Sequence, residues 1–331
     1  MSAIVCAGDQ YYESPKKVFN VTMDITEHCP YACSYCYEGK RKQKRQLAYK
    51  DFCTAITRLM TVASPNLPFK FVFFGGEPLC HPQILDMIAF TKKTFPDAAI
   101  CSTSNVYQSI NFLEELYTID PGFIMNFSVH FEYINYEDAL QKVAFLAKIN
   151  KRNIFNVIYL PEKRQQVQDF IVEAKSALTE EQNRLHVKFI RSKKSGFTTN
   201  LKTYTEEDYL FKTKNTGENE YLFIGMKEND SYFRKQYFFS DNSNASLASF
   251  TGMLCTYPMH RLRIKIDGRY FACHCYRENQ SNILEDANIN VITAPVPCKA
   301  KKCRCNDQRR AAKFNDWKYA PKYLTQGPTY A

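Results

Sequence analysis

The sequence contains no apolar run that approaches the roughly 18 residues of a membrane-spanning helix. Its first residues also lack the apolar stretch of a secretory signal peptide. These two absences argue against membrane-spanning and secreted proteins, and they predict a soluble protein that stays in the cytoplasm. Glycine and proline are few, at 11 and 14 of 331 residues, so collagen-like and low-complexity chains are excluded.

Apolar and aromatic residues are plentiful by contrast, at 45% and 15% of the chain. This is enough material for a large core and for more than one domain. The net charge of +10 could attract nucleic acid, phosphorylated substrates or an acidic peptide. No helix-turn-helix, RRM or C2H2 signature accompanies the charge, so a nucleic-acid partner is not favoured. We expect a solvated basic face that steers a cofactor or substrate.

Short β-branched or apolar segments alternate with segments of helical periodicity over the first 200 residues. This alternation predicts a parallel sheet, and right-handed crossovers would curl it into an α/β fold, a partial (β/α)6 TIM-like barrel. In such sheets the active site lies at the carboxyl ends of the strands. We expect strands over 19–26, 70–76, 98–105, 122–131, 153–161 and 185–191, and helices over about 47–63, 81–95, 111–118, 136–150 and 163–178.

The 13 cysteines are the most informative residue type. Disulfides are rare in a reducing cytosol, where clustered cysteines more often hold a metal. Cys6, Cys53, Cys80 and Cys101 are isolated in the sequence, and a buried free thiol behaves as a small hydrophobic side chain. The other nine cysteines form two groups, one near each end of the chain.

The first group is Cys29, Cys33 and Cys36, with the spacing C-x3-C-x2-C, in the loop expected after the first strand. A structural zinc site takes four protein ligands, and a catalytic one takes three plus water. A [4Fe–4S] cluster held by three thiolates leaves its fourth iron open to an outside ligand. Three thiols therefore indicate an open coordination position for a cofactor.

The cysteine spacing, with Tyr35 just before the last cysteine, resembles the signature of the radical S-adenosylmethionine (SAM) superfamily. The resemblance extends to the GGEP motif at the end of the second predicted strand, which in that family lines the methionine amino group of SAM. By this resemblance Tyr35 and the motif's residues belong to the cofactor site. They are Gly75, Gly76, Glu77 and Pro78.

The resemblance implies a [4Fe–4S] cluster on Cys29, Cys33 and Cys36, with SAM on the open iron. One electron from the reduced cluster would break a C–S bond of SAM, and the resulting 5′-deoxyadenosyl radical would abstract hydrogen from a bound substrate. The cofactor would supply the hard step, and the protein would supply placement and exclusion of water. Glu77 would give the ammonium group of SAM a carboxylate partner.

Further strand ends match the family more loosely. Ser104 and Asn105 close the segment STSN, and Ser128 resembles a serine placed near the SAM ribose or carboxylate. The segment VIYLP, with Tyr159, corresponds to the strand end that packs against adenine. Polar side chains are common at strand ends in any case. His130 could touch the substrate, but a satisfied structural histidine is the ordinary interpretation.

The second cysteine group opens with C-x12-G-x4-C, from Cys255 to Cys273, which resembles the start of a SPASM or twitch domain. The segment RIKIDGRYFAC predicts a hairpin with Asp-Gly at its turn. The full SPASM pattern needs more cysteines than remain, so we expect one auxiliary [4Fe–4S] cluster. Its candidate ligands are Cys255, Cys273, Cys298, Cys303 and Cys305.

Cys275, two residues from Cys273, shares a strand face with it and could still reach the metal. A structural zinc ribbon is the alternative, because thiolate sites for zinc and for iron–sulfur clusters look alike in sequence. Either metal would stabilise a small C-terminal domain with little core of its own.

The expected domains are a radical SAM core over 1–200, a bridging segment over 201–250 that forms a hairpin, and a SPASM/twitch-like auxiliary Fe–S domain over 251–331. The basic run 40–45 follows the first cysteine group. It is either a solvated loop or a contact for a flavodoxin- or ferredoxin-type reductant or an acidic substrate.

The resemblance thus implies a radical SAM enzyme, and we rank a peptide or protein substrate first, as in the modification of ribosomal peptides. A sugar, nucleotide or other small molecule, consistent with the positive charge, is the alternative. A non-catalytic metal-binding interaction protein is the alternative of another class. The GGEP motif argues against it, because a purely structural site would not need that motif.

Overall fold

The computed structural model of the chain describes residues 4–6, 18–36, 44–62, 67–179, 185–192, 199–200, 204–215, 221–228, 231–238, 251–252, 254–273, 281–286, 288–299 and 313–314. Among these residues there is no helix with the length and apolar character needed to cross a membrane.

A nine-stranded sheet is the centre of the fold, with the order β15-β14-β13-β2-β3-β4-β5-β6-β7. Strands β2 to β7 pair in parallel, each with the next along the chain. These strands are β2 (Phe19–Thr26), β3 (Phe69–Gly75), β4 (Ala99–Ser104), β5 (Ile124–Val129), β6 (Ile154–Tyr159) and β7 (Leu185–Phe189). The crossovers are α1 (Tyr49–Leu59), α2 (Ile84–Thr94), α3 (Ile110–Ile119), α4 (Tyr136–Ile149) and α5 (Arg164–Ser176). The α/β fold expected from the sequence is confirmed, with element ends shifted by a few residues.

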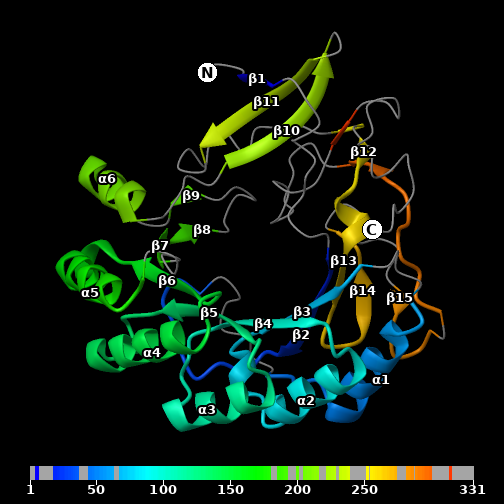
Figure 1. Ribbon diagram of the computed structural model, residues 1–331, viewed down its shortest axis with the longest axis horizontal. Helices are drawn as coiled ribbons and strands as arrows, with labels where there is room; N and C mark the ends of the chain where they lie inside the picture. The colour runs from blue at the N-terminus through cyan, green and yellow to red at the C-terminus, as the bar shows by residue number, and fades with distance from the viewer. Residues whose placement is uncertain are drawn as a thin grey trace.

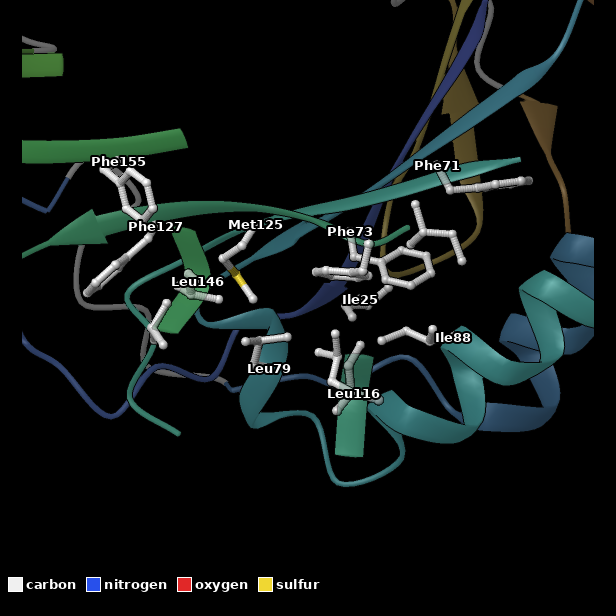
Figure 2. Packing of buried hydrophobic residues seen from close by; sticks show 14 of the residues in the cluster. Ile25, Phe71, Phe73, Leu79, Ile88, Leu116, Met125, Phe127, Leu146 and Phe155 are labelled. Carbon is white, nitrogen blue, oxygen red and sulfur yellow. The ribbon is translucent and has the colours of Figure 1, made fainter. Parts of the chain in front are cut away.

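The helices follow one another around the outer side of the sheet (Figure 1). Strand side chains point to opposite faces in turn, so every second residue faces these helices. In β5 and β6 the helix-facing positions are buried and the intervening ones are half-buried. Figure 2 shows this core between sheet and helices. Its labelled members are Ile25, Phe71, Phe73, Leu79, Ile88, Leu116, Met125, Phe127, Leu146 and Phe155.

The half-buried positions form the inner face of the sheet, the face opposite the helices. Inner-face positions on neighbouring parallel strands lie side by side, as Thr22 of β2 does beside Arg263 of β13. This face is more polar than the helix-facing one, which carries most of the large apolar side chains.

The predicted C-terminal hairpin is present as β13 (Arg261–Ile264) and β14 (Arg269–Phe271). Gly268 forms its turn with φ of +81°, and a Cβ there would lie 2.2 Å from Asn282 Oδ1, so glycine is required. Strand β13 pairs in parallel with β2, and β14 pairs with β15 (Ser281–Asn282). The hairpin assigned to the C-terminal domain therefore extends the sheet of the core.

The segment 201–250 contains the predicted hairpin, β10 (Tyr221–Glu228) with β11 (Ser231–Phe238). It also contains α6 (Glu206–Asn215), which the sequence analysis did not predict. The local signal is a capping box, in which Thr205 and Asp208 exchange backbone-to-side-chain hydrogen bonds. The remaining short strands are β1 (Ile4–Cys6), β8 (Arg191–Ser192), β9 (Thr199–Asn200), β12 (Leu254–Cys255), β16 (Val296–Pro297) and β17 (Lys313–Phe314).

Asp208 joins α6 to the core through a buried carboxylate. Tyr159 Oη donates to Asp208 Oδ1 at 2.6 Å, and Arg164 Nη2 donates to Oδ2 at 2.9 Å. Burial acts to raise the pKa of Asp208, but the bonds from Tyr159 and Thr205 and the charge of Arg164 together hold it below its ordinary value. The carboxylate therefore stays ionised, and it stabilises the attachment of α6 to β6 and α5.

Changing Asp208 to Asn is expected to lower the free energy of unfolding by about 1–3 kcal/mol at pH 7, because charged hydrogen bonds are lost. A depressed pKa contributes stability above the unfolded-state value of about 3.9, and that stability is lost as pH falls through the folded-state pKa. The difference between variant and wild type should therefore shrink in acid. Urea melts across pH measure both effects.

The matched control is Glu207→Gln. Glu207 lies 3.8 Å from the same arginine, Arg164, but its side chain is 75% exposed. Exposed ion pairs contribute about 0–1 kcal/mol, so this variant should melt close to wild type. Equal effects of the two substitutions would contradict the assigned role of Asp208.

Candidate functional site

The carboxyl ends of β2, β3, β4 and β5 meet at one edge of the sheet, where polar groups of α/β proteins gather. The structure brings most of the predicted site residues to this edge. They are Cys29, Cys33, Tyr35 and Cys36 after β2, Gly75 to Pro78 after β3, Ser104 and Asn105 after β4, and Ser128 and His130 near the end of β5.

Two glycines bring the end of β3 against the start of the cysteine loop, residues 27–36. Gly76 N–H donates to Thr26 O at 2.8 Å, and Glu77 N–H donates to His28 O at 2.7 Å. A Cβ on Gly75, whose φ is +151°, would lie 1.9 Å from Thr26 O. A Cβ on Gly76 would lie 2.3 Å from His28 O. Both positions need glycine because two backbones approach this closely.

The carboxylate of Glu77 connects the ends of β3 and β4. It accepts hydrogen bonds from Ser104 Oγ at 2.7 Å, Asn105 N at 2.6 Å and Leu79 N at 3.1 Å. Burial raises the pKa of Glu77 to about 7, although these donors oppose the shift. Glu77 and Ser104 are thus bonded to each other, and their contact with a cofactor stays a prediction.

The three thiols of the cysteine loop form no disulfide, and their exposure rises from Cys29 and Cys33, which are half-buried, to Cys36. Burial, and then the charges of Glu77 and Cys36, raise the pKa of Cys29. Burial and the charge of Glu132 raise the pKa of Cys33 to about 12. Burial and these negative charges disfavour the thiolate forms, and a bound cation would favour them. The three thiols are therefore a donor set that suits an iron–sulfur cluster.

No three His, Cys, Asp or Glu side chains converge on one point in the described part of the chain, the cysteine loop included. A [4Fe–4S] cluster carries its cysteine ligands on separate irons, so its three thiols need not converge on one point. Cys36 is exposed, and its N–H donates to Cys33 O at 3.0 Å.

Residues after β5 hold the cysteine loop from the other side. Tyr35 stacks on His130 with ring centroids 5.9 Å apart, and its hydroxyl lies 3.0 Å from His130 Nδ1. Burial lowers the pKa of His130 to about 4, which keeps the ring neutral at pH 7. Glu132 accepts from Ser34 N at 2.8 Å and from Ser34 Oγ. Glu132 could not be predicted as a site residue, because nothing in the sequence shows that these two loops meet.

The inner face near Ser128 carries two asparagines that the sequence analysis also missed. Asn156 Nδ2 donates to Asn126 Oδ1 at 3.0 Å, and Asn156 pairs with Ser128 across the strands. The sequence did carry a signal for both. Asn126 lies two residues before Ser128 and Asn156 two residues before Ile158, and residues two apart on a strand share a face. Tyr159 lies on the opposite face, fully buried against α6, so its side chain is not part of this group.

Three of the C-terminal candidate ligands, Cys255, Cys273 and Cys298, are buried and form no disulfide. Strand β12 pairs Cys255 with Val296 of β16, and Gly252 N–H donates to Cys298 O at 2.9 Å. These contacts place the Cys255 and Cys298 segments side by side. The remaining cysteines of this group, Cys275, Cys303 and Cys305, lie outside the described residues.

Comparisons with known proteins give matches over the segment that contains the cysteine loop and the GGEP motif. A family model described as "4Fe-4S single cluster domain" matches residues 21–136, from β2 to the start of α4. The GTP 3′,8-cyclase of Microcystis aeruginosa (strain NIES-843 / IAM M-2473) is 28% identical over 101 residues, which are 29% of this chain and 30% of the cyclase.

Solved structures share the fold of this chain over most of its length. Native anSMEcpe with bound AdoMet aligns with 81% of this chain and 78% of its own, at 12% identity and a TM-score of 0.52. Streptococcus suis SuiB bound to precursor peptide SuiA aligns with 83% and 64%, at 14% identity and a TM-score of 0.51. At these identities the matches show a shared fold, and the family model covers the cysteine loop and the GGEP motif.

Proposed function

We propose that this chain is a radical SAM enzyme in which Cys29, Cys33 and Cys36 hold a [4Fe–4S] cluster and the open iron binds SAM. The main support is the close joining of the cysteine loop to Gly75 and Gly76, within the segment that matches a 4Fe-4S domain. When bound, the cluster and SAM would supply a 5′-deoxyadenosyl radical that abstracts hydrogen from the substrate.

The chain's own residues place and shield this site. The backbone bonds from Gly76 and Glu77 fix the start of the cysteine loop relative to β3. Tyr35 and His130 pack beside Cys33 and limit the access of water to that thiol. On the inner face Ser128, with Asn126 and Asn156, offers hydroxyl and amide groups suited to the polar groups of SAM or substrate.

Anaerobic purification followed by metal analysis and a SAM-cleavage assay tests the proposal. We expect about four iron and four sulfide per cluster, and release of 5′-deoxyadenosine when the protein is reduced with SAM present. Zinc alone, without sulfide after reconstitution, and no release would contradict it. That result would favour a metal-binding interaction protein.

An auxiliary [4Fe–4S] cluster in a SPASM/twitch-like region belongs to the same proposal, with ligands from Cys255, Cys273, Cys298, Cys303 and Cys305. The adjacent Cys255 and Cys298 segments support it. The metal analysis separates two outcomes: about eight iron per chain indicates two clusters. About four iron with one zinc indicates a zinc-stabilised C-terminal region.

We rank a peptide or protein substrate first, with an electron from a flavodoxin- or ferredoxin-type reductant. A protein of the same fold, SuiB, is bound to its precursor peptide. The basic run 40–45 remains the candidate contact for the reductant, and most of it lies outside the described residues. Within it, Arg45 pairs with Glu27 at 2.8 Å, so part of its charge is compensated.

An anionic small molecule such as a nucleotide is the second candidate substrate, favoured by the charge of the inner face. Asp24 pairs with Arg263 at 2.8 Å and with Lys265 at 2.6 Å, so one carboxylate serves two cations. On the described strands, and just after β13, basic side chains at inner-face positions include Lys70, Lys188, Arg261, Arg263 and Lys265.

Arg263 and Lys265 lie together beside this single carboxylate and would attract an anion. Changing Arg263 to Gln should then weaken the binding of an anionic substrate. It should leave the binding of a neutral peptide unchanged. Isothermal titration with GTP and with an uncharged peptide of similar mass compares the two candidates.

A further inference from the structure

Val106, two residues after the end of β4, has a strained backbone. Its φ is +47°, in the left-handed region that a β-branched side chain rarely adopts. The side chain is fully buried. Such a conformation persists only where its surroundings hold it, and it occurs most often at functional sites.

Two hydrogen bonds hold Val106 in this conformation. Its N–H donates to Ser104 Oγ at 2.8 Å, and its carbonyl accepts from Lys142 Nζ at 2.9 Å. Lys142 comes from α4, is only 4% exposed, and pairs with Asp138 at 2.8 Å. Asp138 pairs with the charge of this buried lysine, and the ammonium group uses a further N–H on the Val106 carbonyl.

The strained turn fixes the side chain of Asn105. Its backbone N–H donates to Glu77 Oε2 at 2.6 Å, and its Oδ1 accepts from Tyr107 N–H at 3.0 Å. Because a backbone N–H can only donate, the atom facing Tyr107 is the amide oxygen. The amide nitrogen therefore points the other way, and Nδ2 lies 3.5 Å from Cys29 Sγ.

We propose that Asn105 donates a hydrogen bond to the Cys29 thiolate that holds the cluster, and that Lys142 is the positioning residue that keeps the donor in place. This rests on the proposed function. A donor to a ligand sulfur stabilises the reduced cluster, which carries more negative charge, and so raises its reduction potential. Asn105 would thereby make the cluster easier to reduce.

If Asn105 served only to close the turn, its amide NH2 group would have no role. A turn closed by Tyr107 N–H needs only an acceptor oxygen, which aspartate or serine would supply as well. The distinguishing atom is Nδ2, which has the thiol sulfur as its neighbour. The two roles therefore predict different results when the acceptor is kept and the donor is removed.

The test is the midpoint potential of the cluster bound by Cys29, Cys33 and Cys36, from a redox titration followed by electron paramagnetic resonance. In Asn105→Ser, which keeps an acceptor for Tyr107 but cannot reach Cys29, the ratio of reduced to oxidised cluster at a fixed potential should fall about tenfold. For one electron this is a midpoint about 59 mV lower. Asn105→Leu, which removes both bonds, should show the same shift.

Gln108→Leu is the matched control. Gln108 Nε2 donates to Leu79 O at 2.8 Å and lies 3.9 Å from Cys80 Sγ, a thiol outside the C-x3-C-x2-C group. This amide is near the same edge of the sheet, so its loss should leave the potential unchanged. A shift equal to that of Asn105→Ser would overturn the proposal.

Lys142→Met tests the positioning role. Alone it should lower the potential in the same direction, because Asn105 is no longer held. Added to Asn105→Ser it should change nothing more, whereas loss of a positive charge acting directly on the cluster would lower the potential in both backgrounds. An additive effect would therefore contradict the positioning role.

The same titration separates this inference from the function on which it rests. A wild-type chain that assembles the cluster and cleaves SAM, with unchanged potentials in both Asn105 variants, would overturn the inference alone. A wild-type chain that assembles no four-iron cluster would overturn the proposed function.

Discussion

Changing Cys33 to Ala should reduce the release of 5′-deoxyadenosine to background and remove the iron of the first site. Three thiolates are the fewest that hold a four-iron cluster with one open iron, so two thiols leave two irons without a protein ligand. Cys33 is the middle thiol of the cysteine loop, and it lies 3.7 Å from His130 Nδ1. Loss of cluster assembly rather than misfolding should cause the effect.

Cys53→Ala is the control for this prediction, because Cys53 is a half-buried thiol on α1 outside both cysteine groups. It should retain iron, sulfide and SAM cleavage. Circular dichroism of Cys33→Ala should match wild type, since the half-buried thiol contributes little to the core. Release at the wild-type rate from Cys33→Ala would show that the first cluster is not held by these cysteines.

The parallel part of the sheet, β2 to β7, could be predicted from the sequence because each of its elements carries a local signal. In the segments that became β5 and β6, buried side chains alternate with half-buried ones, and the helices between strands have a 3.6-residue apolar period. A single rule, that the carboxyl ends of parallel strands meet, then placed Cys29, Gly75 and Asn105 at one edge. These predictions needed no knowledge of long-range contacts.

Contacts between distant segments could not be predicted in this way. The hairpin of β13 and β14 was expected, but its parallel pairing with β2 joins residues about 240 positions apart. The same limit applies to Glu132, which bonds to Ser34, and to Lys142, which bonds to Val106. In each case the sequence shows an ordinary polar residue, and only the fold supplies its partner.

The side-chain direction of Tyr159 shows a different limit. The strand end was placed correctly, but alternation puts Tyr159 on the helix-facing side, where its hydroxyl donates to Asp208. Residues 157 and 159 share that face, so the half-buried Ile158 between them is on the inner face. The alternation of faces along the strand could have been read from the sequence. The helix that covers Tyr159, α6, was not predicted.

Gly76→Ala should have a large effect on the site. The added Cβ would lie 2.3 Å from His28 O and 2.8 Å from Glu27 O, both backbone atoms that a side-chain rotation cannot move. The cysteine loop must shift, and the bonds from Gly76 to Thr26 and from Glu77 to His28 are strained or lost. We expect a loss of about 2–4 kcal/mol in the free energy of unfolding.

The shift should also weaken cluster binding, because His28 immediately precedes Cys29 and moves the first thiol with it. Iron per chain after reconstitution and a urea melt measure the two effects on one sample. Gly122→Ala is the matched control, since its Cβ would meet the nearest atom, the side-chain Oδ1 of Asp120, at 3.2 Å, where a small rotation relieves the contact. If Gly76→Ala kept full iron and wild-type stability, the close approach of β3 to the cysteine loop would not be what shapes the site.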